Sequence, residues 1–561
     1  MSCCTKKFCM GLCLIAVIIF YGRKGGAQET GVEVISEGKV ESKTAGVMEK
    51  GTAPEGVTEA ANKGVKEKEN VRIESNGRKK GASFDITLKV DTLYTHMSDL
   101  IVSDLPQSRP PEEVLYSNEL GMNNTGGARF RITPKFDYRE IMQIVAEGDF
   151  LLYPFGDSPE GVGEASDFRT HTGNLSNWRT WFNPRHLYFQ FNLPFGILRM
   201  GQMGSSWGMG ILANDGSTPP PFGVYFGGDI VERVLFATKP LLKIGKDWIK
   251  DLTVAIAGDL VFDDITAKLY EGDIAWQGVF ALRWPWKEHL AGFYFVYRNQ
   301  KSSDDRTLEV YVFDGHLRLS GMIKDTLQPY AEGEIAHVMG KATMARSVQQ
   351  LGGHDVRQLG VAGKVGLKWL SSIDIYMEVG YSSGDANTYD GVLRSFTMDP
   401  GHRIGLVLFP EVLAWQSARC SEIAASDELT GEDNPGIDLL PTNGGVSGAF
   451  YVNPVITVRP VKILEFSAGL IFARTSSYLI SPWEQKNTGS PAGYLGGSAL
   501  KRNLGIEADL AAWLKIPLKY IKANAGVEFG YFWPGEYFSD HSGKRMPDVW
   551  LISGRLAIGY D

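Results

Sequence analysis

A strict alternation of apolar and polar residues begins at Phe84 and returns along most of the chain. In Phe84–Asp91 (FDITLKVD) every second residue is apolar. Successive side chains of a β-strand point to opposite faces, so such a segment has one apolar and one polar face. The chain is therefore predicted to be all-β. The same pattern recurs in 129–138, 187–193, 253–261, 453–459, 503–513 and 550–560.

Three features favour a transmembrane antiparallel β-barrel over a soluble β-sandwich, whose strands also alternate. Many candidate strands run to about 10–15 residues, whereas strands of globular proteins average ~5–6. Aromatic residues lie near the ends of the apolar faces, as in the girdles of membrane barrels. Short connections alternate with long ones, as the tight periplasmic turns and long outer loops of such barrels do. The short connections are 194–196, 285–288, 370–372, 460–462 and 516–518, and the long ones are 98–126, 154–185, 204–228, 341–355, 384–446 and 476–501.

The pattern yields about 18 strands. An even number places both chain ends on the periplasmic side, as in bacterial barrels. A barrel of 16–18 strands leaves an aqueous channel, whereas an eight-stranded one is filled by its own side chains. The candidates are 83–97, 127–140, 141–153, 186–193, 197–203, 229–239, 251–263, 272–284, 289–300, 306–320, 326–340, 356–370, 372–383, 447–460, 462–475, 502–516, 518–533 and 548–560.

One apolar run does not fit the even count. Arg403–Trp415 (RIGLVLFPEVLAW) lies inside the longest loop, 384–446. Counting this run as a strand would place the two chain ends on opposite sides of the membrane. We therefore expect it to fold into the lumen or over the mouth, with a helix as one form. Loop 384–446 is the candidate constriction.

The N-terminus carries the one stretch apolar enough to enter a membrane as a helix. Phe8–Tyr21 follows Lys6 and Lys7 and precedes Gly25-Gly26-Ala27, which is the order of a secretory signal peptide. We predict a signal peptide over 1–27, with a membrane anchor as the alternative. The mean hydropathy of −0.13 argues against a bundle of membrane-spanning helices.

Signal cleavage changes both the cysteine content and the charge of the chain. Cys420 is the one cysteine left, which excludes an intrachain disulfide. Cleavage also removes four cations and no anion, so the net charge falls from −8 to −12, which argues against nucleic acid as a partner. Residues 28–80 contain no aromatic residue and are rich in Gly, Glu and Lys. We predict a disordered periplasmic tether there, with a weak coiled coil as the alternative, and the barrel over 81–561.

Several short motifs resemble a known group of outer-membrane proteins. Gly201-Gln202-Met203 followed by Trp207-Gly208-Met209-Gly210, the run Gly380–Asn387 (GYSSGDAN) and the run Gly530–Gly535 (GYFWPG) are similar to segments of Gram-negative alginate-export-type and related porin-like barrels. This resemblance implies an outer-membrane channel. In the best-known members it implies export of an anionic polysaccharide. The chain departs from many such barrels in ending on Tyr560-Asp561 rather than on an aromatic residue.

The polar faces of the strands supply the candidate pore-lining residues. If the apolar faces point to lipid, the alternate positions line water, and rings of charge there select ions by sign. Two interpretations stay open: the charges neutralise one another, or a row of cations on one strand guides anions. The row is Arg129, Arg131, Lys135 and Arg139, and the other candidates are Arg283, Arg298, Arg318, Arg459, Glu334 and Glu378.

Signals for an enzyme or a metal site are weak. Gly204–Gly208 fits the G-x-S-x-G pattern, but a hydrolase elbow needs a strand-to-helix turn in an α/β sheet, and Ser206 lies at a barrel rim. The nine His residues are scattered. Asp385, Asn387 and Asp390 crowd one loop, where an Asx-rich turn is favoured over a Ca²⁺ site. We expect no enzyme, cofactor or metal.

The sequence thus predicts a porin-like channel of the bacterial outer membrane for passive diffusion of small hydrophilic solutes or ions. Two alternatives remain, a dedicated exporter of an anionic polysaccharide and a structural or adhesive barrel blocked by its own loops. The expected partners are outer-membrane lipid and small hydrophilic or anionic solutes. A homotrimer is one assembly to test, and residues 28–80 offer a periplasmic contact.

Overall fold

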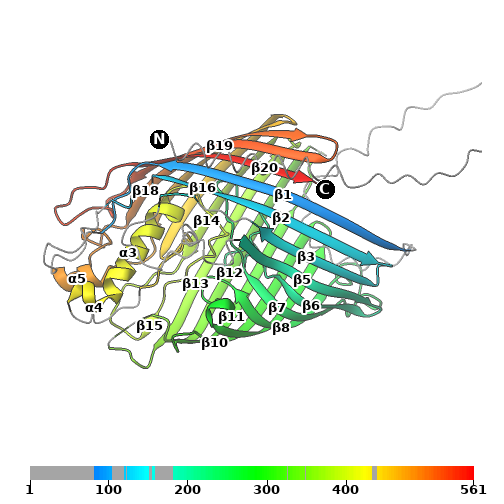
Figure 1. Cartoon of the computed structure of the whole chain (residues 1–561), viewed down its shortest axis with the longest axis horizontal. Coiled ribbons are helices and arrows are strands. Elements are labelled where there is room, and N and C mark those ends of the chain that lie inside the picture. The colour runs from blue at the N-terminus through cyan, green and yellow to red at the C-terminus, as the bar shows by residue number, and fades with distance from the viewer. Residues whose placement is uncertain are drawn as a thin grey trace, which may run out of the picture. The chain divides into compact units, whose positions relative to one another are not determined.

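The last long strand of the chain pairs with the first. β20 (Val549–Tyr560) runs antiparallel to β1 (Ala82–Met97), from Leu88 opposite Tyr560 to Met97 opposite Leu551. Each of the other long strands pairs antiparallel with its neighbours in chain order, so the sheet closes on itself (Figure 1). A closed sheet leaves no edge of unpaired backbone groups, which is the condition for strands to cross a membrane.

The computed structural model describes residues 81–103, 119–121, 123–150, 155–157, 181–324, 326–345, 347, 349–431 and 439–560. All of them belong to the unit Glu69–Asp561. The predicted signal peptide, 1–27, and the predicted tether, 28–80, lie outside the described residues.

The long strands number eighteen and match the predicted ones one for one, so the predicted barrel is confirmed. Two short strands lie in the long loops, where β4 (Phe155–Gly156) pairs with β2 and β15 (Val392–Leu393) pairs with β13. The other wall strands are β2 (Asn124–Tyr138), β3 (Met142–Phe150), β5 (Phe182–Leu193), β6 (Gly196–Gly204), β7 (Ile230–Thr238), β8 (Thr253–Asp263), β9 (Ile274–Trp286), β10 (His289–Lys301), β11 (Thr307–Ser320), β12 (Leu327–Ala342), β13 (His354–Trp369), β14 (Ile373–Ser382), β16 (Ala449–Val461), β17 (Leu464–Thr475), β18 (Asn503–Pro517) and β19 (Ile521–Pro534).

The two ends of the barrel differ in their connections. The turn side, where β1 begins and β20 ends, carries mostly short turns, such as Arg139–Glu140, where both residues have positive φ as a two-residue hairpin turn requires. Arg139 therefore lies beyond the end of β2, not on the strand as predicted. The loop side carries the long connections. The helices within the described residues are η2 (Leu269–Glu271), η3 (Leu408–Leu413), α3 (Ala414–Ala425), α4 (Asp427–Thr430) and α5 (Pro482–Thr488).

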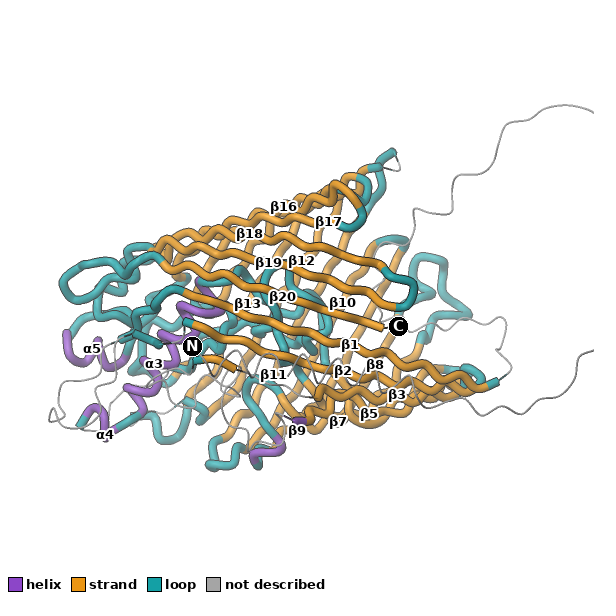
Figure 2. The backbone as a smooth tube through the Cα atoms, turned by 45° about the horizontal axis from the view of Figure 1, so that its top comes forward, coloured by secondary structure: helices purple, strands orange, loops and turns teal. Residues whose placement is uncertain are grey.

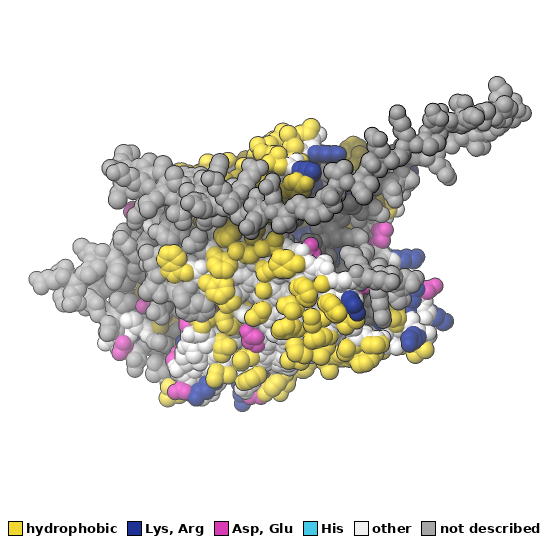
Figure 3. Space-filling view, turned by 45° about the vertical axis from the view of Figure 1, so that its right-hand side comes forward, with side chains coloured by type: hydrophobic (Ala, Val, Ile, Leu, Met, Phe, Trp, Pro, Cys, Tyr) yellow, Lys and Arg dark blue, Asp and Glu magenta, His cyan; other side chains and the backbone are white. Residues whose placement is uncertain are grey.

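The alternation of the sequence becomes two unlike surfaces of the wall. On β12, Ile335 points outward and is 51% exposed, while its neighbours Glu334 and Ala336 point inward and are buried. Figure 3 shows hydrophobic side chains gathered over the visible wall of the barrel. An apolar surface of this extent is stable only against lipid, because soluble monomers rarely expose apolar patches larger than a few hundred Å².

Outward aromatic rings mark the two borders of this apolar band. Trp284 and Trp286 lie at the turn side with ring centroids 4.7 Å apart. At the loop side Tyr531 and Trp533 on β19 are also 4.7 Å apart, and Tyr297 and Tyr311 form another outward pair at the loop-side ends of β10 and β11. Amphipathic rings favour the membrane–water interface, so the predicted girdles are present. Within the described residues, no helix is long and apolar enough to cross a membrane.

The outward direction of Ile335, near the middle of β12, gives a first prediction. Ile335→Arg should lower the free energy of unfolding in lipid vesicles by about 2–4 kcal/mol, because a cation at mid-membrane depth is poorly solvated. Ile335→Leu, which keeps an apolar side chain, should change it little. Urea titration followed by tryptophan fluorescence measures both. Equal losses in the two variants would contradict a lipid-facing Ile335.

Candidate functional site

Two loop-side segments fold into the lumen instead of extending outward. Loop A comprises residues 205–229, between β6 and β7, and loop B comprises the described residues 383–431 and 439–448, between β14 and β16. Figure 2 shows α3 and α4, which belong to loop B, gathered with α5 at one end of the barrel. Both loops are held by inward side chains of the wall.

The first half of loop A is fixed to strands β10, β11 and β12. The ring of Trp207 stacks on that of Tyr294 with centroids 5.0 Å apart, and its Nε1–H donates to Oδ1 of Asp314 at 2.9 Å. The backbone N–H groups of Met209 and Gly210 both donate to the carboxylate of Glu334. Backbone amides in the interior need such acceptors, since leaving them unpaired costs about as much as a lost hydrogen bond.

The second half of loop A is fixed to the opposite wall. The Gly223 N–H donates to Oε1 of Glu528 on β19 at 3.0 Å, and the guanidinium of Arg555 on β20 donates to the Gly223 carbonyl at 2.5 Å. The ring of Phe226 lies 4.8 Å from the guanidinium carbon of Arg129 on β2. Loop A therefore spans the lumen from β12 to β19 and β20.

Loop B is fixed by one carboxylate at the start of its helical part. Glu507 on β18 accepts hydrogen bonds from the backbone N–H groups of Leu406, Val407 and Leu408 at 2.6, 2.7 and 2.7 Å. These groups precede or open η3, which continues directly into α3. The N-terminus of a helix presents unpaired N–H groups and a partial positive charge, so a carboxylate there is stabilising.

Loop B also brings an apolar core into the barrel. Leu408, Phe409, Val412 and Trp415 are fully buried and belong to the main hydrophobic cluster of the described residues. Phe396 lies against the wall at Gly360, where a Cβ atom would be 2.3 Å from its ring. The run 403–415, which the even strand count excluded from the wall, therefore lies within the barrel and becomes helical at Leu408.

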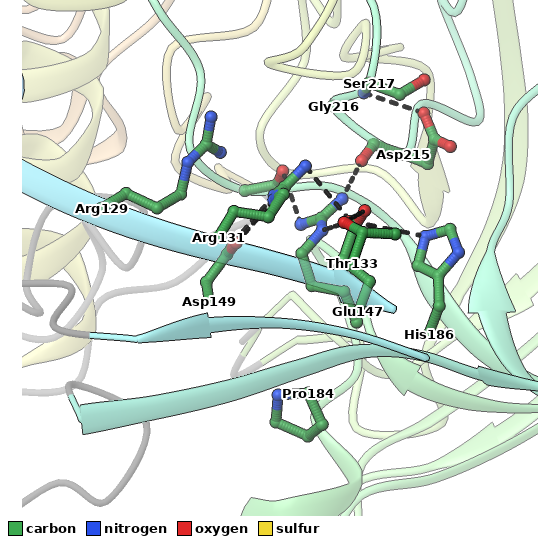
Figure 4. Close-up of polar contacts among 12 residues, drawn as sticks. Arg129, Arg131, Thr133, Glu147, Asp149, Pro184, His186, Asp215, Gly216 and Ser217 are labelled. Carbon is green, nitrogen blue, oxygen red and sulfur yellow. Dashed lines mark hydrogen bonds and ion pairs between the residues drawn. The ribbon is translucent and has the colours of Figure 1, made fainter. Parts of the chain in front are cut away.

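A cluster of paired charges lies on the wall strands β1, β2, β3 and β5 (Figure 4). Arg131 binds Asp149 through two nitrogens at 2.6 and 2.8 Å, and its Nη1 lies 3.2 Å from Oε1 of Glu147. Arg129 pairs with Asp91 at 2.7 Å. Arg129 and Arg131, two members of the predicted cation row, are thus matched by carboxylates on β1 and β3. This favours mutual neutralisation over a free anion-guiding row.

Arg185 completes this cluster and was not among the predicted residues. It is the extra residue of a β-bulge in β5, where Glu147 pairs with His186 while Gly148 pairs with Pro184. The bulge turns Arg185 inward, where its Nε lies 3.3 Å from Glu147 and its guanidinium donates to the carbonyls of Asp215 and Gly227 in loop A. The alternating pattern cannot reveal this residue, because a bulge breaks the period that pattern relies on.

The other predicted residues occupy separate parts of the lumen wall, except Arg139, which lies in the turn after β2. Arg298 pairs with Asp264 at 2.5 Å near the loop side. Lys135 pairs with Asp137 at 3.2 Å and Arg459 with Glu465 at 2.5 Å, both nearer the turn side. Glu378 contacts His402 of loop B at 3.0 Å and Lys364 at 3.1 Å. Arg283 and Arg318 stand at inward positions of β9 and β11, and Arg139 lies over the ring of Tyr138.

Three inward cations near the turn side make no ion pair with a described residue, although Asp374 stands opposite Lys368 in the strand register. Arg199 donates to Oε1 of Gln190 at 2.7 and 3.1 Å and lies over the ring of Tyr188. Lys368 lies over the ring of Tyr330 at 5.1 Å. Lys89 is exposed at an inward position of β1. A cation held by an amide or a ring keeps its full charge, so these positions present positive charge on the inner face of the described wall.

The motifs that could indicate an enzyme or a metal take structural roles. Gly204–Gly208 joins β6 to loop A, where Ser206 is exposed and its neighbour Ser205 accepts a hydrogen bond from Arg233. Asp385 and Asp390 bind the guanidinium of Arg394 and cap Asx turns, as the sequence favoured over a Ca²⁺ site. The described residues contain no cluster of three or more His, Cys, Asp or Glu side chains that could hold a metal ion.

Comparison with known proteins finds likenesses among solved structures. No family model matches the sequence, and no curated protein matches it. The outer membrane protein OprD from Pseudomonas aeruginosa is 10% identical, with a TM-score of 0.45, over 85% of this chain and 92% of that one. Acinetobacter baumannii OccAB1 is 8% identical, with a TM-score of 0.46, over 85% and 96%. Pseudomonas aeruginosa OccK2 (OpdF), solved in complex with glucuronate, is 8% identical, with a TM-score of 0.43, over 85% and 95%.

The anchor of loop B gives a second prediction. Glu507→Gln removes the negative charge to which three backbone N–H groups donate. We therefore expect the free energy of local opening of residues 404–425 to fall by about 1.5–3 kcal/mol, the range for hydrogen bonds to charged groups. Hydrogen exchange of this segment measures the change. Glu332→Gln is the matched control, because Glu332 is also an inward glutamate but pairs with His316 at 2.9 Å. Equal protection of loop B in both variants would contradict the anchor.

The junction of the two loops gives a third prediction, on pH. The Asp399 N–H donates to the carbonyl of Ile211 at 2.9 Å, and the Asp399 carboxylate accepts from the Gly401 N–H at 2.7 Å. Burial, with Asp264 and Asp215 nearby, raises the pKa of Asp399 to about 8. A carboxyl whose pKa is higher in the folded state binds more protons there, so its contribution to stability falls as pH rises from about 4 to about 8.

We therefore expect protection of residues 399–402 against hydrogen exchange, after correction for intrinsic rates, to fall between pH 5 and pH 9. Asp399→Asn, which cannot ionise, should remove most of this fall. An identical fall in the variant would show that another group controls the junction.

Proposed function

We propose that the chain forms a passive aqueous channel for small hydrophilic solutes and ions in a Gram-negative outer membrane. The signal peptide 1–27 would direct its export to that membrane. The observation that carries this proposal is the charged inner wall crossed by two loops that wall carboxylates hold in place. Such an interior provides water-filled polar surroundings and a fixed narrowing, which together define a sieving channel. This function requires no catalytic residue.

The two alternatives fit the geometry less well. An exporter of a polysaccharide needs an uninterrupted wide lumen, whereas loop A is bonded to opposite walls through Glu334 and Glu528. In a barrel whose lumen is blocked by its own loops, a charged side chain without an ion-pair partner would be buried, and burying such a charge is costly. The cations Arg199 and Lys368, held by neutral partners, are therefore better explained by contact with water and passing anions.

We further propose that anion preference arises at the turn side, from Lys89, Arg199 and Lys368, and not from Arg129 and Arg131, whose charge is matched by carboxylates. The remaining pore-lining candidates contribute to the polar wall. A homotrimer and a periplasmic contact through 28–80 remain predictions.

Single-channel recording in a planar bilayer under a salt gradient tests the proposal. The chain should show discrete open steps and a reversal potential of anion-selective sign. Lys89→Gln, Arg199→Gln and Lys368→Gln together should move the reversal potential towards cation preference, because they remove three luminal cations that make no ion pair with a described residue.

The matched control replaces two lysines and one arginine that point outward at the loop side, Lys301→Gln, Lys341→Gln and Arg357→Gln, and should leave the reversal potential unchanged. A folded barrel that passes no current would support the blocked structural barrel instead. An equal shift in both triple variants would contradict the turn-side origin of selectivity.

A further inference from the structure

One turn-side connection is much longer than a hairpin turn. Residues 239–252 (KPLLKIGKDWIKDL) join β7 to β8. The segment is ordered by its own backbone, since the Gly245 N–H donates to the Leu241 carbonyl at 2.7 Å and the Lys250 N–H to the Lys246 carbonyl at 2.9 Å. We call it the lysine loop. It contains no strand, and the other turn-side connections join their strands with far fewer residues, so closing the barrel does not explain its length.

The lysine loop exposes large apolar side chains. Ile244 is 82% exposed, and Leu242 and Trp248 are also exposed. Each such side chain gains about 1.5–3 kcal/mol when it leaves water for an apolar environment. A turn that faced only water would gain nothing from three of them within seven residues.

The exposed apolar side chains continue the lipid-facing surface of the barrel. The Trp248 ring meets that of Trp284 edge-on with centroids 5.6 Å apart, and Trp284 Nε1–H donates to the Trp248 carbonyl at 2.6 Å. Trp284 and Trp286 stand on the outward face of β9 and belong to the turn-side girdle. The loop is thus attached to the outside of the wall, at the depth of the membrane interface.

Cations accompany these apolar groups. Lys239 pairs with Asp251 at 2.9 Å and Lys250 with Asp247 at 3.0 Å, so the charges of these lysines are matched within the loop. Lys243 and Lys246 are exposed, and neither makes an ion pair with a described residue. The loop therefore carries a net positive charge next to its apolar side chains, the combination that binds the boundary between acyl chains and phosphate headgroups.

We propose that the lysine loop is an interfacial anchor. Leu242, Ile244 and Trp248 insert into the phospholipid leaflet at the turn side, and Lys243 and Lys246 bind its headgroup phosphates. The four-carbon stems of the lysines lie along the apolar region while their ammonium groups reach the phosphates. The anchor fixes the depth of the barrel on the β7–β9 side, where the loop extends the girdle outward from the wall.

Site-directed spin labelling of the full chain in vesicles tests this anchor. The label is placed at Ile244→Cys, with the five native cysteines replaced by serine and folding checked by circular dichroism. Leu351→Cys is the matched control, because Leu351 is 87% exposed on a loop-side segment for which we propose no lipid contact. In vesicles that contain phosphatidylglycerol, collisions with oxygen relative to a water-soluble nickel complex should be several-fold more frequent at 244 than at 351.

The lysines are tested in the same system. Lys243→Gln with Lys246→Gln should reduce the oxygen-to-nickel ratio at 244 several-fold in phosphatidylglycerol vesicles, whereas Lys301→Gln with Lys341→Gln should not. Equal ratios at 244 and 351 would overturn the anchor. A high oxygen-to-nickel ratio at 244 that disappears when the protein is diluted in excess lipid would also overturn the anchor. It would assign this surface to contact with a second copy of the chain. An unchanged oxygen-to-nickel ratio at 244 in the Lys243→Gln, Lys246→Gln variant would overturn the headgroup contact.

Discussion

The arrangement of the lumen depends on a few wall carboxylates that accept hydrogen bonds from the backbone of the inner loops. Glu334 holds the first half of loop A and Glu528 its second half, and Glu507 holds the start of the helical part of loop B. Where a loop packs against the inner wall its backbone N–H groups are shielded from water and outside the sheet, so they need acceptors there. Carboxylates supply two oxygens each and bind several donors at once, which lets single side chains on rigid strands place whole loops.

Charge pairing shapes the rest of the interior. Arg129, Arg131 and Arg185 are matched by Asp91, Asp149 and Glu147, so a dense group of charges becomes a neutral, rigid part of the wall. Where the partners are amides or rings instead, as for Arg199 and Lys368, the positive charge persists. Inward arginines and lysines therefore either neutralise a carboxylate or keep their positive charge in the lumen. The neighbouring side chain determines which of the two occurs.

The sequence predicted the wall far better than the lumen. Period-two alternation, strand length and the rhythm of turns and loops are local properties, and they located each strand because every wall position faces either lipid or the interior. The role of Glu507 and the inward direction of Arg185 depend on partners about 100 and 30 residues away, and on a bulge that interrupts the period. Loop A was predicted as a long outer loop, and nothing in its sequence pattern indicated that it folds into the lumen.

By itself, the sequence determined that this chain forms a closed barrel of eighteen strands with an apolar outer surface, because alternating side chains in a membrane leave one way to satisfy both the backbone and the lipid. It also showed that the run 403–415 is not a wall strand, since an odd count would separate the chain ends. Only the tertiary structure decided which cations are neutralised, which carboxylates hold the loops and how loop A crosses the lumen. Those properties arise from distances between residues on different strands, which register, shear and bulges fix together and which no single segment encodes.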